Sequence, residues 1–257
     1  MTNTYRVLVL PDIHVPFHDV AAIDAVIDYA REETWDEFIQ LGDFVDLDVV
    51  SRFVIGKPGV IEGRRLSDDY DMGRNLLDRL LSAVRKKNPS CKATMLEGNH
   101  EHRINRWLDS FPQLRGMLEV PAGLGLKERG VNWVEADSKG HVYSVRGVSF
   151  AHGLYFNLHH AKKTLEEFDV GDIWYGHCHD QQEYTKSSYG ARKRRGGSLG
   201  CLCSMDLDYV QGRPTRWQHG FGAFFFGGST YAAHRVRIDG GEFVAPNGKL
   251  YGRSKKK

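Results

Sequence analysis

Short apolar runs and amphipathic stretches alternate along the first part of the chain. Residues 5–10 (YRVLVL) are a β-rich apolar run that stops at Pro11, and the loop after it is rich in proline and aspartate. Beyond Asp19, a favourable helix N-cap, apolar residues recur at intervals of three and four, as on one face of an amphipathic helix. The chain is therefore predicted to open with a strand, a loop and a helix.

The same order of elements is expected again further along. A strand is predicted at 37–41, followed by a long helix after Ser67 that should end near Asn88, and a third strand is predicted at 91–96, followed by a helical stretch through Trp107. The residues expected on the buried face of the long helix are Met72, Leu76, Leu77, Leu80 and Val84.

Beyond residue 130 the pattern changes to short β-like runs separated by glycines, with one helical break at 159–168. Alternating strands and helices followed by mostly strands predict an α/β fold, in which two sheets form a sandwich flanked by helices. No repeat, linker or boundary is visible, so residues 1–257 are interpreted as a single domain. The predicted late strands are 131–134, 141–145, 148–151, 173–175, 183–185, 223–226 and 234–238.

Polar side chains with metal-binding chemistry follow five of the predicted strands. Ligands in open α/β sheets gather at the carboxyl ends of strands, so we expect these side chains to converge on one crevice. Imidazoles, carboxylates and an amide suit Mn, Fe, Zn or similar divalent ions, and their number indicates two ions, a pair suited to phosphoester hydrolysis. The residues are Asp12, His14, Asp43, Asn99, His100, His152, His177 and His179.

The motifs that contain these residues resemble, in the same order, the five motifs of calcineurin-like metallophosphoesterases. They span residues 12 to 179 and leave the C-terminal part of the chain uncovered. The compact length also resembles phosphatases encoded by phages and prophages. The motifs are Asp12-Ile13-His14, Gly42-Asp43, Gly98-Asn99-His100-Glu101, Ala151-His152-Gly153 and Gly176-His177-Cys178-His179.

The resemblance implies a role for each motif residue. It implies that Asp12, His14 and His179 hold one metal ion, that Asn99, His152 and His177 hold a second, and that Asp43 bridges the two. His100 is implied to be a catalytic residue that protonates the leaving oxygen or stabilises its charge, while a hydroxide between the metals attacks phosphorus. Mn is the expected metal, with Fe, Zn, Ni and Mg as alternatives.

Histidines outside the motifs are interpreted as ordinary surface or core residues. His159 and His160 are adjacent on the helix predicted after the fourth motif, where we expect them to face solvent.

The composition predicts where the protein acts and shows that charge is unevenly distributed along the chain. Hydrophobic residues make up 41% of the chain and charged residues 26%, which excludes disorder, collagen and coiled coil. Without a long apolar run, a signal peptide or a CxxC pair, the chain is expected to be soluble and cytoplasmic, in the host cytoplasm if phage-encoded, with free cysteines and no membrane partner. Residues 1–185 carry 21 Lys+Arg against 29 Asp+Glu, whereas residues 186–257 carry 14 against 4.

Basic residues provide the candidate substrate contacts. The loop 186–197 begins shortly after the last motif, so Arg192, Lys193, Arg194 and Arg195 are predicted to contact the phosphates of a nucleic acid, together with the basic C-terminal tail and nearby aromatic residues. The alternative is a solvated hairpin with aromatic residues in the core. Arg103, on the helix after His100, is a candidate for a bidentate phosphate contact, although a surface arginine is an equally good interpretation.

Three functions remain open from the sequence. The favoured function is a phosphodiesterase or nuclease acting on nucleic acid or nucleotides. The alternative is a phosphomonoesterase acting on phosphoproteins or small molecules, against which the GDFVDL stretch at 42–47 lacks the arginine of the GDxVDRG motif of protein phosphatases. A non-catalytic metal-binding scaffold ranks lowest, because the chain keeps every ligand and the catalytic histidine.

Overall fold

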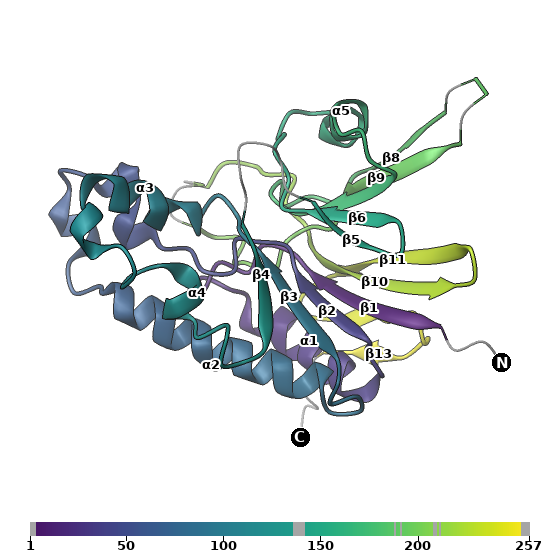
Figure 1. Ribbon diagram of the computed structural model, residues 1–257, viewed down its shortest axis with the longest axis horizontal. Helices are drawn as coiled ribbons and strands as arrows, with labels where there is room; N and C mark the ends of the chain where they lie inside the picture. The colour runs from purple at the N-terminus through teal and green to yellow at the C-terminus, as the bar shows by residue number, and fades with distance from the viewer. Residues whose placement is uncertain are drawn as a thin grey trace.

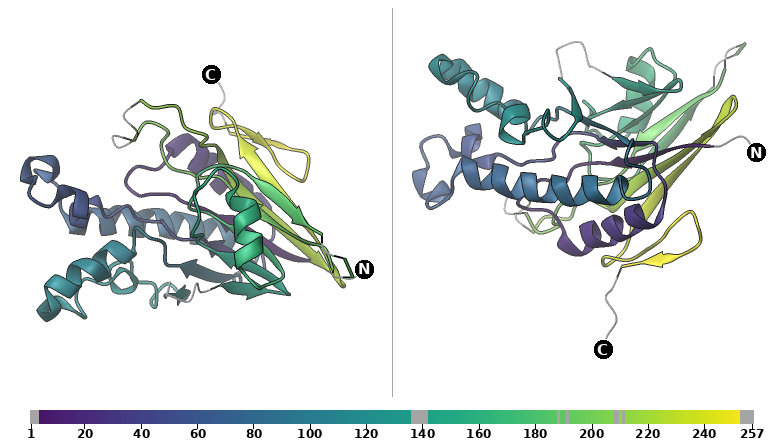
Figure 2. Two further views of the ribbon diagram at one scale, coloured as in Figure 1. Left: turned by 90° about the horizontal axis from the view of Figure 1, so that it is seen from above. Right: turned by 60° about the horizontal axis from the view of Figure 1, so that its bottom comes forward.

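Two β-sheets pack face to face between two layers of helices (Figures 1 and 2). This computed structural model describes residues 4–135, 142–187, 189–190, 192–207, 210 and 212–252. The first sheet has six strands, in which β1, β2, β3 and β4 run parallel and β10 and β11 pair antiparallel at one edge. Its order is β11 (Thr230–Ile238), β10 (His219–Gly227), β1 (Tyr5–Leu10), β2 (Glu37–Gln40), β3 (Lys92–Leu96) and β4 (Val131–Val134).

The second sheet has five strands, of which β6, β7 and β9 run parallel. A separate two-stranded sheet pairs β12 (Phe243–Val244) with β13 (Leu250–Tyr251). The order of the five strands is β5 (Tyr143–Val145), β6 (Val148–Ala151), β7 (Asp172–Tyr175), β9 (Arg194–Ser198) and β8 (Glu183–Lys186).

Helices cover the outer faces of both sheets. α1 (Val20–Glu32) and α2 (Leu66–Val84) lie on the first sheet, and α5 (His160–Glu167) lies on the second (Figure 1). The remaining helices are shorter, and most of them lie beside the carboxyl ends of β1, β2 and β3. They are α3 (His102–Ser110), α4 (Val120–Gly123) and the 3-10 turns η1 (Asp48–Val50), η2 (Arg52–Val54), η3 (Pro58–Ile61) and η4 (Pro112–Leu114).

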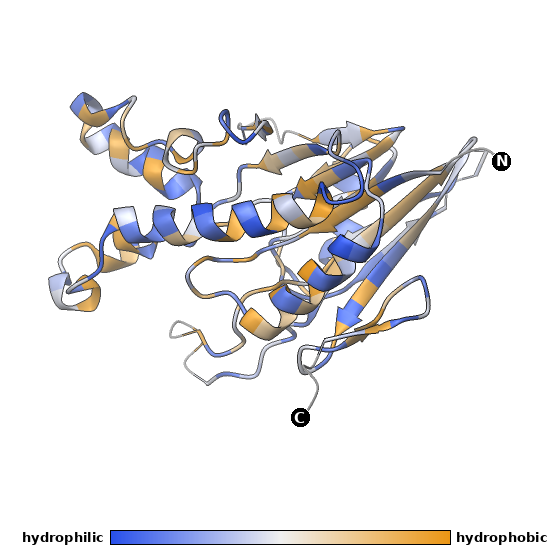
Figure 3. Cartoon of the chain, turned by 90° about the horizontal axis from the view of Figure 1, so that it is seen from below, coloured by the Kyte–Doolittle hydropathy of each residue, from blue (hydrophilic) through white to orange (hydrophobic). Residues whose placement is uncertain are grey.

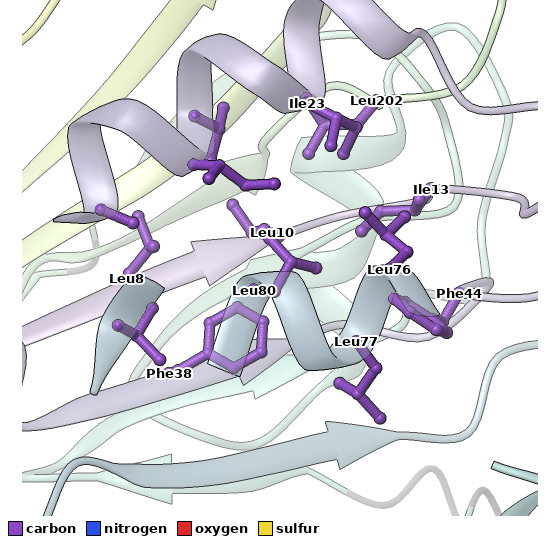
Figure 4. Packing of buried hydrophobic residues seen from close by; sticks show 14 of the residues in the cluster. Leu8, Leu10, Ile13, Ile23, Phe38, Phe44, Leu76, Leu77, Leu80 and Leu202 are labelled. Atoms are coloured by element: carbon purple, nitrogen blue, oxygen red, sulfur yellow. The ribbon is translucent and has the colours of Figure 1, made fainter. Parts of the chain in front are cut away.

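Alternate residues of β1 contribute to two different apolar layers. Leu8 and Leu10 pack against α1 and α2, as Figure 4 shows, whereas Val7 and Val9 face the second sheet. A strand covered on both faces needs a continuous apolar run, which explains the YRVLVL sequence. The strands are accordingly mostly hydrophobic in Figure 3, while α1 and α2 each show one apolar and one polar side.

The fold class predicted from the sequence is confirmed, with elements close to the expected positions. Asp19 caps α1 by accepting a hydrogen bond from the backbone N–H of Ala22 at 2.8 Å. His141, which belongs to the predicted strand 141–145, lies outside the described residues. So does Tyr209, one of the aromatic residues expected near the basic loop. Among the described residues, no helix has the length and apolar character needed to cross a membrane.

One predicted loop contains a strand. Residues 194–197 of the expected basic loop belong to β9, which continues to Ser198 and lies between β7 and β8 in the second sheet. At the two glycines of the sequence RRGGS, the neighbouring strands leave no room for a side chain. A Cβ on Gly196 would collide with the carbonyl of Ile173, and one on Gly197 with the carbonyl of Gln182.

The expected orientation of two side chains was wrong. Met72 is 44% exposed, because the buried stripe of α2 runs through Asp69, Tyr70 and Gly73, and Met72 lies beside it. His160 is fully buried instead of facing solvent: its Nδ1 lies 2.7 Å from the Tyr175 hydroxyl and its Nε2 lies 2.8 Å from Asp180. Its partners, Tyr175 and Asp180, lie outside α5, so the sequence pattern of that helix alone does not indicate that His160 is buried.

Candidate metal centre

The predicted ligands come together where five parallel strands end. Loops after β1, β2 and β3 of the first sheet and after β6 and β7 of the second sheet all reach the same edge of the sandwich. This edge is the crevice that the strand-end rule predicts. The loops bring together the side chains of Asp12, His14, Asp43, Asn99, His152, His177 and His179.

Ligand atoms of Asp12, His14, Asp43 and His179 form the first group, within 4.8 Å of one another. The Nε2 atoms of His14 and His179 lie 3.1 Å apart. His14 Nε2 is 3.7 Å from Asp43 Oδ2, and His179 Nε2 is 3.5 Å from Asp12 Oδ1. Two carboxylates and two imidazoles thus face a common point.

Asp43 also belongs to a second group, with His152 and His177. His152 Nε2 lies 3.4 Å from Asp43 Oδ2, 3.2 Å from His177 Nδ1 and 2.9 Å from the side-chain oxygen of Asn99. Among the carboxylates of the described residues, Asp43 alone belongs to both of these groups.

The spacing of these atoms fits divalent cations. Ligands that lie about 2.1 Å from one ion are about 3.0 to 3.4 Å apart at octahedral to tetrahedral angles. The separations of 2.9 to 3.7 Å within the two groups are close to that range. A set of nitrogen and oxygen donors suits borderline and hard divalent ions such as Mn, Fe and Zn.

Neighbouring groups orient the ligand side chains. His14 Nδ1 lies 3.0 Å from the Asp46 carboxylate, and His152 Nδ1 lies 3.0 Å from the Leu41 carbonyl oxygen. A proton on each Nδ1 leaves the Nε2 lone pair directed to the centre, the usual arrangement of a metal-binding histidine. Both oxygens of Asp12 accept from the His177 N–H at 2.9 Å, which fixes that carboxylate as well.

A buried carboxylate that is not a predicted ligand joins two of the loops. Glu101 is fully buried and accepts hydrogen bonds from the backbone N–H groups of Asp43, Phe44, Val45 and Gly98, at 2.7 to 3.0 Å. These donors belong to the loops that carry Asp43 and Asn99. Glu101 therefore sets the position of the two loops relative to each other.

The backbone at the site is held in unusual conformations. Of the described residues other than glycine with a positive φ, Arg146 alone lies away from this region, and the rest include Asp12, His14, Asp43, His177 and His179. Such conformations cost free energy and persist where the surroundings enforce them, as in functional sites. A Cβ on Gly98 would collide with Asp43, and one on Gly176 with Asp12, so these glycines allow the close approach of the carboxylates.

The carboxylates draw positive charge into the centre. Burial lowers the pKa of the His177 imidazole to about 4. Burial opposes the charged forms of His152 and His179 too, yet Asp43 beside the first and Asp12 beside the second raise their pKa values to about 9. Carboxylates that favour the protonated form of these two buried imidazoles also favour the binding of cations.

His100 is placed beside the ligands, and its side chain is not among the atoms of the two groups. Its Nδ1 lies 3.1 Å from the Asp46 backbone carbonyl and 3.2 Å from the Asp46 carboxylate, and its Nε2 lies 3.9 Å from Asp43 Oδ2. Arg103 Nη1 donates to Asp46, and its Nη2 lies 2.9 Å from His100 Nε2. The structure places the Arg103 side chain beside His100. This position suits the predicted phosphate contact better than the alternative of a surface arginine, and the contact itself stays a prediction.

A cleft of about 910 Å³ opens over these residues. Phe53, Val60 and Phe156 line it, and the Trp217 ring packs edge-on against His179 at 4.4 Å between centroids. Phe53 and Phe156 are 67% and 77% exposed, so their rings face the opening.

The four predicted basic contacts do not line this cleft. Arg194 donates to the carbonyl oxygens of Leu165, Phe168 and Val170, and Arg195 contacts Tyr231. Arg192, Lys193, Arg194 and Arg195 border a separate pocket with Asp172.

No pattern in the sequence assigned a role to Asp46 or Glu101, and Trp217 was expected only as one of the aromatic residues near the basic loop. Asp46 and Glu101 stand inside two of the quoted motifs, GDFVDL and GNHE, so their polar character beside a ligand was an available signal. Trp217 lies far from any motif, and no signal in the sequence connects it to His179.

Comparisons with known proteins agree with this geometry. The profile of the calcineurin-like phosphoesterase family matches residues 5–195. The Gene 54 protein of Mycobacterium phage L5 is 26% identical over 259 residues, covering 93% of this chain and 95% of its own length. This similarity confirms the expected resemblance to phage proteins.

Several solved structures align with most of this chain. Vps29 from Chaetomium thermophilum aligns over 98% of this chain and 97% of its own, with 12% identity and a TM-score of 0.48. A metallophosphoesterase from Sphaerobacter thermophilus aligns over 91% and 88%, with 16% identity and a TM-score of 0.44.

The family match covers most of the chain and includes all the predicted motifs. The chain belongs to the calcineurin-like phosphoesterase family, and it is a metal-dependent phosphoester hydrolase.

Proposed function

We propose that the chain is a phosphodiesterase that acts on nucleotides or nucleic acid. The observation that supports this proposal is the lining of the cleft over the candidate centre, which includes two exposed aromatic rings, Phe53 and Phe156. A diester carries a group on both sides of phosphorus, whereas a monoester carries one. Aromatic side chains stack on unpaired bases.

In this proposal, Asp12, His14 and His179 would hold one divalent ion, Asn99, His152 and His177 would hold another, and Asp43 would be shared between the two groups. Mn is the metal we propose. When bound, two such ions supply an activated water and neutralise the oxygens of the phosphoryl group.

The remaining steps belong to the side chains of the cleft. Arg103 binds a non-bridging oxygen of the substrate, for which its guanidinium offers paired donors. His100 acts once a substrate oxygen has replaced its Nε2 as the partner of Arg103 Nη2: the ring, protonated at both nitrogens, then protonates the leaving oxygen from Nε2 or stabilises its charge, and Asp46 holds the ring by its Nδ1 side. Glu101 keeps the loops of Asp43 and Asn99 in place during the reaction.

We also propose that the whole chain is one domain that acts in the cytoplasm of a cell or a phage host. β9, β10 and β11, in the part that follows the motifs, complete the two sheets and support this interpretation.

The test compares p-nitrophenyl phosphate, bis-p-nitrophenyl phosphate and single-stranded DNA as substrates of the protein reconstituted with Mn²⁺. The proposal expects higher kcat/KM for the diester than for the monoester, together with cleavage of DNA. A clear preference for the monoester would replace it with the phosphomonoesterase alternative.

A further inference from the structure

A second groove opens from the cleft of the candidate centre and has no role in the proposed chemistry. It has a volume of about 620 Å³, within the range of ligand sites, and it lies between α3 and the segment of η1 and η2. Ser51, Phe53, Asn99 and Arg103 line both the groove and the cleft, so the two spaces are continuous.

The groove is positively charged in a part of the chain that is acidic as a whole. Arg52, Arg103 and Arg106 line it, and none of its lining residues is an Asp or Glu. Arg103 pairs with Asp46, but Arg52 and Arg106 form no ion pair with a carboxylate among the residues that the structure describes. Two arginines therefore keep their charge available for an anion.

Aromatic rings stand beside these arginines. Trp107 and Phe111 pack on each other with ring centroids 4.4 Å apart, and Phe111 is 40% exposed. The Arg52 guanidinium lies over the Phe53 ring at 5.0 Å from its centroid. Arginines and exposed aromatic rings in one groove are a combination that binds unpaired polynucleotides, since guanidinium groups pair with phosphates and the rings stack on bases.

We propose that this groove binds the nucleotides next to the scissile phosphate of an unpaired strand. Arg52 and Arg106 contact the flanking phosphates, and Phe53 and Phe111 stack on bases. The inference rests on the proposed phosphodiesterase function, which it extends by naming a single-stranded polynucleotide as the substrate and the path that it follows.

The β8–β9 hairpin is the competing location for a polyanion and provides the matched control. Figures 1 and 2 place β8 and β9 at the end of the molecule opposite to α3. Arg192 and Lys193 lie next to β9, so that Arg192→Gln with Lys193→Gln removes the same two charges as Arg52→Gln with Arg106→Gln.

The experiment uses the full chain loaded with Mn²⁺. Kinetics on bis-p-nitrophenyl phosphate, which is too short to enter the groove, are compared with kinetics on fluorescein-labelled hexathymidylate. Binding of hexathymidylate is measured by fluorescence anisotropy in a His100→Asn background, in which turnover is slow. A duplex of the same length is the third ligand.

The groove pair, Arg52→Gln with Arg106→Gln, should weaken hexathymidylate binding at least about tenfold and raise its KM. The slope of log K against log salt should fall by about 1.4, because each lost phosphate contact on a single strand contributes about 0.7. Hydrolysis of bis-p-nitrophenyl phosphate should stay within about twofold of the unmodified protein. Phe111→Ala should weaken binding with the salt slope unchanged, and the duplex should bind less tightly than the single strand.

Unchanged hexathymidylate binding by the groove pair, or loss of binding in the hairpin pair instead, would overturn the inference while diester hydrolysis still supports the proposed function. Equal binding of the duplex would also overturn it. If the unmodified protein hydrolyses monoesters alone, the proposed function fails, and the anisotropy result still decides whether the groove binds a strand.

Discussion

At the level of single residues, Glu101 joins the two loops that carry Asp43 and Asn99 through four backbone hydrogen bonds. Glu101→Gln replaces an acceptor oxygen with an NH₂ group that faces N–H donors. We expect the free energy of unfolding to fall by about 2–4 kcal/mol, because buried N–H donors lose one of the two acceptor oxygens that they share. We also expect Mn²⁺ to bind less tightly. Urea unfolding and metal titration measure both effects.

Glu119 provides the control for this substitution. It also accepts backbone hydrogen bonds, from Gly116 and Leu118, but near the surface, where water can replace it. Glu119→Gln should change stability little and leave Mn²⁺ affinity unaltered. Equal effects of the two substitutions would contradict the positioning role of Glu101.

His100 has a catalytic role in our proposal without being a ligand. His100→Asn should lower kcat by about two to four orders of magnitude, the scale of general acid catalysis, while two metal ions remain bound. A leaving group of low pKa should restore much of the rate. His102→Asn, at the first residue of α3, should keep full activity. Loss of metal from the His100→Asn variant would instead show that His100 is a ligand.

The candidate ligands could be predicted from the sequence because each follows a strand within a few residues. Their supporting contacts could not. Asp46 lies 32 positions from His14, and Glu101 lies 58 positions from Asp43, so only the folded chain brings these pairs together.

At the level of elements, the first turn of α2 contains a buried acidic residue. Asp69 Oδ2 has no hydrogen-bond partner among the described residues, and burial raises the pKa of Asp69 to about 6 despite the neighbouring Arg64 guanidinium. In the unfolded chain the pKa is about 3.9. The folded state therefore holds the proton more tightly, and this contribution to stability is complete below about pH 4 and lost as the pH rises through 6.

Asp69→Asn removes that dependence on pH. The free energy of unfolding of the variant minus that of the unmodified protein should increase by up to about 3 kcal/mol between pH 4 and pH 8. Denaturant unfolding of both proteins at each pH measures the difference, in which other titrating groups cancel. Asp68→Asn, an exposed neighbour on the same helix, should show no such trend, and a flat difference for Asp69→Asn would refute the assignment.

Within β9, the Arg194 guanidinium donates to three backbone carbonyls between α5 and β7. Arg194→Gln should lower the free energy of unfolding by about 1–3 kcal/mol, since a charged donor to several partly buried acceptors is lost. Arg192→Gln, close in sequence, should change it by less than about 0.5 kcal/mol. Urea unfolding separates the two, and equal stability of both variants would show that Arg194 has no structural role.

Most strands could be predicted because they are apolar and sit between turn signals. β9 could not, because its glycines result from the closeness of β7 and β8, which is a property of the assembled sheet. The exposure of Met72 could not be predicted either, because it depends on which face of α2 is buried, and that face runs through Gly73 and not through Met72.

At the level of the whole molecule, the basic C-terminal part is distributed over both sheets. β9 is in the second sheet, and β10 and β11 pair beside β1 in the first. Part of its positive charge is used in internal contacts, such as the ion pair of Arg235 with Glu183 at 2.9 Å. Some of the basic residues behind the charge asymmetry therefore have a structural role, and the groove that we propose for a polynucleotide lies in the acidic part of the chain.

The most direct test of the account is the metal content of the protein after reconstitution with Mn²⁺ and removal of free ions. Two ions per chain are expected for the unmodified protein and for Asp24→Asn, a surface control. Asp43→Asn should hold one ion or fewer, because Asp43 Oδ2 faces both groups of ligand atoms. A maximum of one ion in the unmodified protein, or two tightly bound ions with full activity in Asp43→Asn, would contradict a centre in which Asp43 joins two metals.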